Sequence, residues 1–211
     1  MLSYIEPLPI IRDEEHHKYF WEPTQEWLAY STTGIIGAKK TPEQLATFAK
    51  TKHIWGPRGT HVHWCLEQFM RGNKDPDPMG FADWVVPLLA HPFWNTFEPL
   101  AVEYMLCDLK KSVGGQLDLL GRDHKNDQLV LIDLKTQSSV RASKYSTDAQ
   151  MGSYIDALWI HHRLKVDACR TVWARPKKTV LGQVQPVDQC SQAWAEAWDY
   201  FRESQITSKP F

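Results

Sequence analysis

The feature that most constrains this chain is the apolar run from Leu129 to Lys135, in which Asp133 and Lys135 are the only charged residues. A run of Val, Ile and Leu of this length is typical of a strand buried on both faces of a sheet. Side chains alternate across a strand, so Asp133 and Lys135 lie on the same face. Because burying an unpaired charge is unfavourable, these two residues indicate a functional site.

A second strand is predicted from Val113 to Leu120, and the residues between the two strands, Asp123 to Asp127, are typical of a turn. The resulting hairpin places Asp118 almost opposite Asp133. Cross-strand Cβ atoms are ~4.5–5.5 Å apart, so the two carboxylates repel each other unless a cation lies between them. Oxygen ligands favour a hard divalent ion, and the pair predicts Mg²⁺ or Mn²⁺ as the cofactor.

Lys135 adds a catalytic element to this predicted metal site. An ammonium beside the metal ion can hold or help deprotonate an attacking water, and it can offset charge on a phosphate in the transition state. The alternative interpretation is a surface hairpin on which an Asp and a Lys form a weak ion pair. The apolar neighbours of Asp133 and Lys135 favour the catalytic interpretation.

The rest of the chain alternates predicted helices and strands, without repeats or low-complexity tracts. Helices are predicted at 31–36, from Thr41 to a break at Gly56–Gly59, and at 60–70, 81–90, 148–162 and 189–204, and strands at 113–120, 129–135, 169–174 and 180–186. This order predicts an α/β fold with a mixed central sheet flanked by helices. The length fits a single domain, 1–211, with an irregular N-terminal lead-in over 1–30 and a core over 31–204.

The composition is that of a globular protein, with 43% apolar and 23% charged residues. No segment is apolar over the ~18 residues that a membrane span needs, and the N-terminus has no basic region followed by an apolar run. We therefore expect an intracellular protein, in the cytoplasm of a bacterium or a phage-infected cell, with no membrane partner. The net charge of −1 does not decide about nucleic acid, because a basic groove can offset an acidic metal site.

Five short motifs occur in order along the chain. They are Gly59-Thr60-x-x-His63, Glu103, Gly115-x-x-Asp118, Asp133-x-Lys135-Thr136 and Gln150-x-x-x-Tyr154. Together they resemble the RecB-like branch of the PD-(D/E)xK nucleases, over most of the chain. Two departures are minor: no proline precedes Asp118, which is common in this branch, and the second acid is Asp rather than Glu. The length is similar to that of the stand-alone phage exonucleases and the mitochondrial genome-maintenance exonuclease.

The resemblance implies a restriction-endonuclease-like core whose catalytic residues are Asp118, Asp133 and Lys135. It implies that the metal ion is bound by His63, Asp118, Asp133 and the backbone carbonyl of Leu134. Glu103 would bind a second metal ion or orient a water, with a plain surface glutamate as the alternative.

The resemblance also implies residues that hold the DNA. Gln150 and Tyr154 are four apart, so they share one helix face, which would flank the site and hold the substrate strand. The alternative is a buried polar pair that packs the helix on the sheet. Thr136 is expected to bind phosphate or to continue the strand, and Arg141 and Lys144 are expected to guide phosphates toward the metal ion, or else to be solvated.

The four cysteines, Cys65, Cys107, Cys169 and Cys190, are far apart and form no CxxC motif, so we interpret them as small buried hydrophobic residues. Some relatives in the family carry an iron–sulfur cluster whose last three cysteines are grouped near the C-terminus. This chain has no such grouping, so we expect no iron–sulfur cluster.

The function that the resemblance implies is phosphodiester hydrolysis by an exonuclease acting on single-stranded DNA or frayed ends in replication, recombination or repair. DNA is the expected partner, together with other replication or recombination proteins. One alternative is a structure- or sequence-specific endonuclease. Another is a non-catalytic nucleic-acid-binding relative, which would require the loss of Asp118, Asp133 or Lys135, and all three are present.

Overall fold

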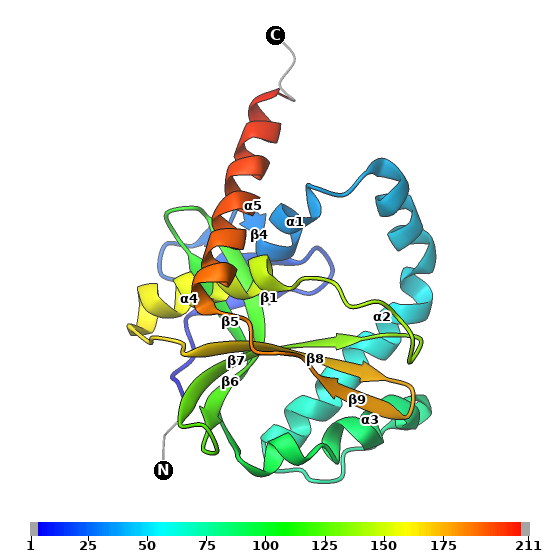
Figure 1. Cartoon of the computed structure of the whole chain (residues 1–211). Coiled ribbons are helices and arrows are strands. Elements are labelled where there is room, and N and C mark those ends of the chain that lie inside the picture. The colour runs from blue at the N-terminus through cyan, green and yellow to red at the C-terminus, as the bar shows by residue number, and fades with distance from the viewer. Residues whose placement is uncertain (1–3, 208–211) are drawn as a thin grey trace.

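A computed structural model of the protein describes residues 4–207. Its centre is a six-stranded mixed sheet, in which β5 (Phe97–Asp108), β6 (Val113–Asp123) and β7 (Gln128–Thr136) are antiparallel neighbours (Figure 1). β8 (Ala168–Arg175) joins β7 in parallel, β9 (Lys178–Leu181) joins β8 antiparallel, and β4 (Tyr30–Ser31) runs parallel to the start of β6.

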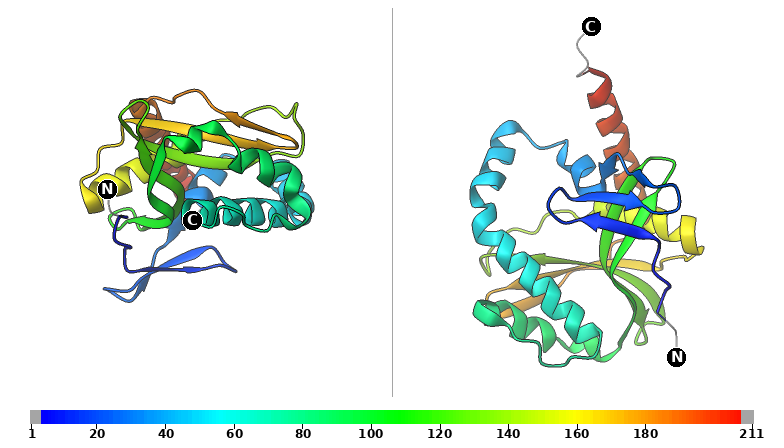
Figure 2. Two further views of the ribbon diagram at one scale, coloured as in Figure 1. Left: turned by 90° about the horizontal axis from the view of Figure 1, so that it is seen from below. Right: turned by 180° about the vertical axis from the view of Figure 1, so that it is seen from behind.

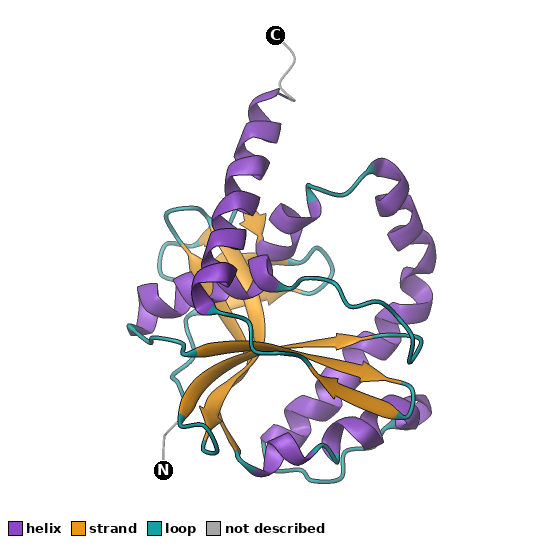
Figure 3. Ribbon diagram, in the orientation of Figure 1, coloured by secondary structure: helices purple, strands orange, loops and turns teal. Residues whose placement is uncertain are grey.

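Helices cover both faces of this sheet (Figure 3). On one face lie α2 (Pro42–Met70), α3 (Ala82–Leu89) and the short 3-10 turns η1 (Met79–Phe81) and η2 (Pro92–Asn95). On the other face lie α4 (Asp148–His162) and α5 (Val187–Thr207), with the short α1 (Thr32–Gly37) beside them. The predicted mixed sheet flanked by helices is therefore confirmed.

Each face of the sheet has its own apolar core. On the α2 side, Val62 and Leu88 pack with Ile132 and Leu134 of β7. On the α4 side, Met151, Leu158 and other apolar residues pack with Leu131 of β7. β7 is thus buried on both faces, as its apolar run predicts.

The hairpin of β6 and β7 forms as predicted. The strands pair from Leu119 opposite Ile132 to Asp123 opposite Gln128. The Asp123 carboxylate accepts hydrogen bonds from the backbone N–H of Lys125 at 3.1 Å and from the side-chain amide of Asn126 at 2.7 Å. Side-chain oxygens of Asp commonly stabilise turns in this way, and the turn sets the register of the two strands.

The sheet forks along β6. Its first residues, Val113 and Gly114, pair with β4 on one side and β5 on the other. Its last residues, from Leu119 onward, lie between β5 and β7. Between these segments, among the described strands, residues 115–117 pair with β5 alone, and Asp118 lies where β7 diverges from β6.

Side chains cap the N-termini of the first two helices. Ser31 caps α1 by accepting the N–H of Gly34 at 3.1 Å. Thr41 and Gln44 form a capping box at the start of α2, with Pro42 in the first turn.

The break predicted at Gly56–Gly59 is wrong, because α2 continues through it to Met70. Pro57 has no N–H to donate, and its ring crowds the carbonyl four residues earlier, which bends a helix. Most of residues 42–57 are exposed, so water can bind the freed carbonyl. The helix therefore bends and does not end there (Figure 1).

The irregular structure expected over residues 1–30 is also wrong for much of that segment. β1 (Ile10–Asp13), β2 (Lys18–Trp21) and β3 (Glu26–Trp27) form a small antiparallel sheet that lies across β5 and β6 (Figure 2). Tyr19 packs so tightly on Gly114 that a Cβ at this glycine would lie 2.4 Å from its ring. Strands of two to four residues with charged ends have too little alternation to be recognised from their pattern.

Other boundaries also differ from prediction: β6 ends at Asp123, three residues later than predicted, and β5 is not among the predicted strands. β9 ends at Leu181, five residues before the predicted end, and the last helix is longer than predicted at both ends. All four cysteines are buried and free, as their spacing suggests. Within residues 4–207 we find no helix with both the length and the apolarity to cross a bilayer.

Candidate metal and catalytic site

Asp118 lies at the fork of the sheet, where the β6–β7 ladder ends. Continuing the register by one step beyond Leu119 and Ile132 places Asp118 opposite Asp133, as the hairpin predicts. The Asp118 Oδ2 accepts the backbone N–H of Leu134 at 2.5 Å, which replaces a ladder hydrogen bond. Its side chain is thereby fixed at the gap between the diverging strands.

Asp133 and Lys135 lie on the face of β7 that α4 covers. The Lys135 Nζ donates to Asp133 Oδ1 at 2.7 Å and to Gln150 Oε1 of α4 at 3.1 Å. Asp133 is 2% exposed, and its Oδ2 accepts no hydrogen bond within residues 4–207. The lysine therefore occupies one oxygen of this buried carboxylate and leaves the other free.

α2 contributes His63 to the site. The His63 Nε2 lies 3.1 Å from the carbonyl oxygen of Leu134, and Nδ1 lies 3.2 Å from Glu103 Oε1 and 3.4 Å from Asp118 Oδ1. One imidazole therefore contacts groups from β5, β6 and β7. His61, two residues earlier, instead contacts the carbonyl of Asp77 and the ring of Trp64.

Glu103 lies in β5 opposite Asp118, with a backbone φ of +46°. This left-handed conformation is unfavourable for a residue with a side chain, and such strain is concentrated at functional sites. The Glu103 carboxylate meets His63 through Oε1 and accepts the Gln116 amide at 2.7 Å through Oε2. The plain surface glutamate considered from the sequence does not describe this position.

The carboxylates respond differently to burial. Burial raises the pKa of Asp133 to about 6, against the opposing effect of Lys135. Burial also raises the pKa of Glu103, with Asp118 adding to the effect. For Asp118, burial is outweighed by His63, Lys135 and the Leu134 N–H, which lower its pKa.

The two bases of the site respond to this negative charge. Burial alone would lower the pKa of His63, but Asp118 and Glu103 raise it well above its usual value. Burial also opposes the charge of Lys135, but Asp133 and Asp118 raise its pKa. Lys135 is therefore an ammonium at neutral pH, suited to donating hydrogen bonds.

The donor atoms fit a hard divalent cation. His63, Glu103 and Asp118 offer ligand atoms that all lie within 4.8 Å of one another. The buried Oδ2 of Asp133 needs a positive partner, because an unpaired carboxylate oxygen is costly to bury. Carboxylates, a carbonyl and one imidazole form a donor set that such an ion accepts.

Gln150 and Tyr154 of α4 lie next to the candidate site. Gln150 bonds Lys135 through its oxygen and the Tyr154 hydroxyl through its nitrogen, at 3.1 Å in both cases. Tyr154 is buried, with its ring against Gly115. Gln150 thus holds the lysine, and the buried Tyr154 ring is not placed to stack on a base.

The other residues expected to contact DNA lie at or beyond the end of β7. Thr136 is half-buried, and a Cβ on Gly59 of α2 would lie 3.8 Å from its Oγ1. Arg141 and Lys144 are exposed on the segment that leads from β7 to α4. Arg175 of β8 stabilises this segment by donating hydrogen bonds to Gln137 Oε1 and to the carbonyls of Val140 and Ala142.

Two site residues, Gln116 and Arg12, escape detection from the sequence. The Arg12 Nη1 donates to Gln116 Oε1 at 2.5 Å, which turns the amide nitrogen of Gln116 toward Glu103. Arg12 belongs to the small N-terminal sheet, over 100 residues from its partner in sequence. Gln116 lies inside the Gly115-x-x-Asp118 motif at a position the motif leaves open, so only the neighbouring Asp118 could have drawn attention to it.

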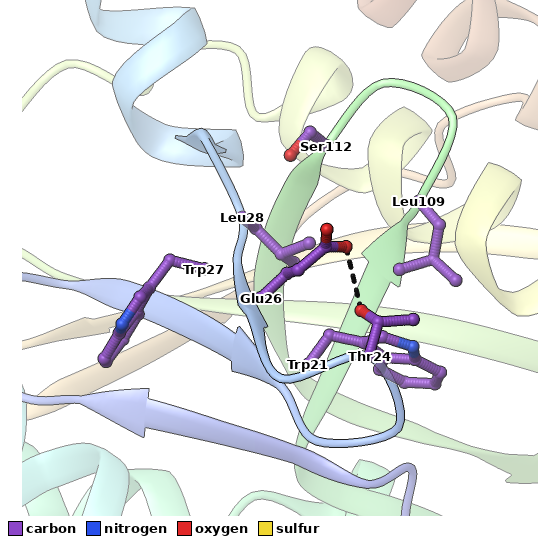
Figure 4. A pocket seen from close by; sticks show the side chains of 7 residues that line it. All are labelled: Trp21, Thr24, Glu26, Trp27, Leu28, Leu109 and Ser112. Atoms are coloured by element: carbon purple, nitrogen blue, oxygen red, sulfur yellow. Dashed lines mark hydrogen bonds between the residues drawn. The ribbon is translucent and has the colours of Figure 1, made fainter.

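A surface pocket of about 420 Å³ lies elsewhere, between the N-terminal sheet and the β5–β6 turn (Figure 4). Trp21, Trp27, Leu28 and Leu109 form its apolar walls, and Glu26 accepts a hydrogen bond from Thr24 at 2.9 Å. None of the predicted site residues lines it.

Comparison with known proteins gives one family. The chain matches no curated protein. The crystal structure of SSO0001 is similar with a TM-score of 0.43 and 15% identity, over 85% of this chain and 76% of that one, which is too distant to bear on function. The PD-(D/E)XK nuclease superfamily matches residues 89–207, which is more than half of the chain and includes Glu103, Asp118, Asp133 and Lys135. The chain therefore belongs to the PD-(D/E)XK superfamily of metal-dependent nucleases, which act on DNA.

Proposed function

We propose that this protein is a Mg²⁺- or Mn²⁺-dependent exonuclease of the RecB-like branch, acting on single-stranded DNA or frayed ends in replication, recombination or repair. The observation that carries the proposal is the position of Lys135. It is held by Asp133 and Gln150, while Asp133 keeps one buried oxygen without a partner among the described residues. A structural ion pair has no need for that free oxygen, whereas a metal ligand does.

Each residue has a role in this proposal. Asp118, Asp133, His63 and the Leu134 carbonyl would hold the metal ion, and Glu103 would complete the set or orient a water. The bound ion would supply a Lewis acid and a water of lowered pKa. Lys135, as an ammonium, would donate to the attacking water or to a phosphate oxygen and stabilise negative charge in the transition state. Gln150 would keep the ammonium in place.

The support for an exonuclease is the shape of the approach to the site. α2 and the β1–β2 hairpin both reach Glu103: His63 of α2 contacts its carboxylate directly, and Arg12 of β1 contacts it through Gln116. Figure 2 shows the hairpin and the helix on the same side of the sheet. Burial lowers the pKa of His17 at the hairpin tip, and the charges of Arg12 and then of Lys52 of α2 lower it further, so the hairpin and the helix are close enough to interact. A strand entering between them is more readily admitted by its end.

Tyr145 would stack on an unpaired base, with its ring supported edge-on by Trp173 at a centroid distance of 5.0 Å. It is 55% exposed, and its pKa responds to Lys135 and Asp133 after burial, so it lies close to the catalytic pair. Stacking on an aromatic ring is worth ~1–3 kcal/mol per base. Arg141 and Lys144 lie on the same segment and would contact the strand's phosphates. We further propose that the whole chain is one nuclease domain.

The test compares linear single-stranded DNA with a covalently closed circle of the same sequence, in Mg²⁺ and in Mn²⁺. We expect digestion of the linear strand, survival of the circle and complete loss of activity in excess chelator. Linear strands blocked at the 5′ or the 3′ end assign the polarity in the same assay. Rapid cutting of the circle would support the endonuclease alternative, and cleavage in chelator would refute the metal site.

A further inference from the structure

Arg58 of α2 is a buried cation without an anionic partner. It is 7% exposed, and it makes no hydrogen bond or ion pair with any residue of the segment 4–207. Its Nε is sealed from solvent and unpartnered, whereas its two terminal Nη groups are not sealed. The guanidinium therefore presents its outer edge to solvent from a buried stem.

The surroundings place Arg58 beside the end of the catalytic strand. Its guanidinium lies over the Trp84 ring of α3, 5.2 Å from the centroid. The Trp84 indole donates to the carbonyl of Gln137 at 2.8 Å, directly after β7. The next residue of α2, Gly59, faces Thr136, the last residue of β7. Two contacts therefore place Arg58 near Thr136: the hydrogen bond from Trp84 to Gln137, and the approach of Gly59 to Thr136.

The free-energy cost of burying the Arg58 guanidinium is poorly compensated by its contacts. A cation–π contact stabilises it only in part, and a buried donor without an acceptor is unfavourable. The Thr136 hydroxyl, which faces Gly59, also makes no hydrogen bond within the described part of the chain. A guanidinium and a hydroxyl that both lack acceptors match the oxygens of a phosphate, which arginine binds in a bidentate manner.

We propose that Arg58, with Thr136, binds a backbone phosphate of the substrate strand other than the phosphate that is cleaved. Arg58 precedes His63 by five residues, which is ~7.5 Å of helical rise, so the two residues reach different points along the strand. This assignment rests on the proposed nuclease function and adds a second phosphate site to it. It also gives the buried charge a function that a neutral side chain, which would pack more favourably, could not perform.

The test is binding of a fluorescein-labelled single-stranded oligonucleotide, measured by anisotropy in Ca²⁺ over a series of salt concentrations. Arg58→Met keeps an apolar stem against Trp84 and removes the charge. We expect its affinity to fall roughly 10- to 100-fold, the loss typical of a charge-assisted hydrogen bond. The slope of log K against log salt should become shallower by ~0.7, the value for one phosphate contact on a single strand. Arg58→Lys, which keeps the charge, should retain the slope and lose only part of the affinity.

Arg163→Met is the matched control, because Arg163 also lies over a tryptophan, Trp159, at 5.5 Å, but on the exposed end of α4. Its affinity and salt slope should equal those of the wild type. Without DNA, Arg58→Met should melt at the wild-type temperature or above, because an unpaired charge is removed. A lower melting temperature with unchanged DNA binding would assign Arg58 a purely structural role and overturn the proposal.

The two proposals fail separately. If the wild type binds DNA without cleaving it, the exonuclease proposal fails and the Arg58 assignment is still decided by the salt slopes. If the wild type cleaves DNA and Arg58→Met binds with the wild-type affinity and slope, only the Arg58 assignment fails. Absence of DNA binding by the wild type would overturn both.

Discussion

At the scale of single residues, the two oxygens of Asp133 have different roles in the candidate site. One oxygen holds the ammonium of Lys135, and the other is buried without a partner among the described residues. Burial raises the pKa of this carboxyl to about 6 even though the Lys135 ammonium opposes the effect, so a second cation at the free oxygen would favour its ionised form. Asp118 is stabilised as the anion by His63, Lys135 and a backbone N–H, which makes it the more permanent negative charge.

Lys135→Ala should abolish cleavage while leaving metal binding in place. The lysine is expected to act on the water and the transition state, and loss of one such contact typically costs ~10²–10³ in rate. Mn²⁺ binding measured by calorimetry should remain within a few-fold of the wild type, in contrast to Asp133→Asn, which removes a ligand charge and should weaken it strongly. A Lys135→Ala enzyme that cleaves labelled single strands at the wild-type rate would show that the catalytic centre is misassigned.

At the scale of elements, the N-terminal hairpin contacts the candidate metal site from outside the central sheet. Arg12 of β1 fixes the orientation of the Gln116 amide, and that amide holds one oxygen of Glu103 so that the other meets His63. Side chains that orient metal ligands typically contribute 10- to 100-fold to metal affinity. The small N-terminal sheet lies at the periphery in Figure 2, but its Arg12 is linked to Glu103 through the side chain of Gln116.

Gln116→Leu and Arg12→Met should each weaken Mn²⁺ binding roughly 10-fold. Gln116→Glu should weaken Mn²⁺ binding more, because a carboxylate at position 116 cannot donate a hydrogen bond to the ionised Glu103 carboxylate. Glu14→Gln is the control, since Glu14 is an exposed partner of Arg12 at 3.4 Å and does not contact Gln116. Calorimetry at constant pH, with circular dichroism to verify folding, measures the effect. Equal affinity in Gln116→Leu and the wild type would leave the hairpin without a role at the site.

At the scale of the whole molecule, the candidate ligands come from α2, β5, β6 and β7, which lie together only in the folded chain. A ligand that binds only the folded state stabilises it by about 2.7 kcal/mol at about 100 times its Kd. For a chain of this size that corresponds to a rise in melting temperature of about 5–10 °C. Calorimetric melting with Mn²⁺ should show this rise, and Asp133→Asn should lose most of it. An equal rise in that variant would place the stabilising ion elsewhere.

Much of β7, which carries the candidate catalytic residues, could be predicted from the local sequence pattern. The apolar run around Asp133 and Lys135 predicted a strand buried on both faces, and the turn residues after Asp123 predicted the hairpin that brings Asp118 opposite Asp133. These features depend on neighbouring residues, because a turn fixes register and a strand's period fixes the face of each side chain. The helix caps at Ser31 and Thr41 were predictable for the same reason.

Contacts between distant segments were decided by the tertiary structure alone. The pairing of Arg12 with Gln116, the strained backbone of Glu103, the unpartnered guanidinium of Arg58 and the unbroken α2 each depend on which elements pack together. Local pattern predicts that Pro57 breaks a helix, but packing against β7 holds the part of the helix that follows Pro57 in place. Sequence alone therefore determined the chemistry of the site, because that chemistry is carried by neighbours in the chain. Folding determined how the site is supported and how it is reached, because these depend on side chains from separate elements that only the packed chain brings together.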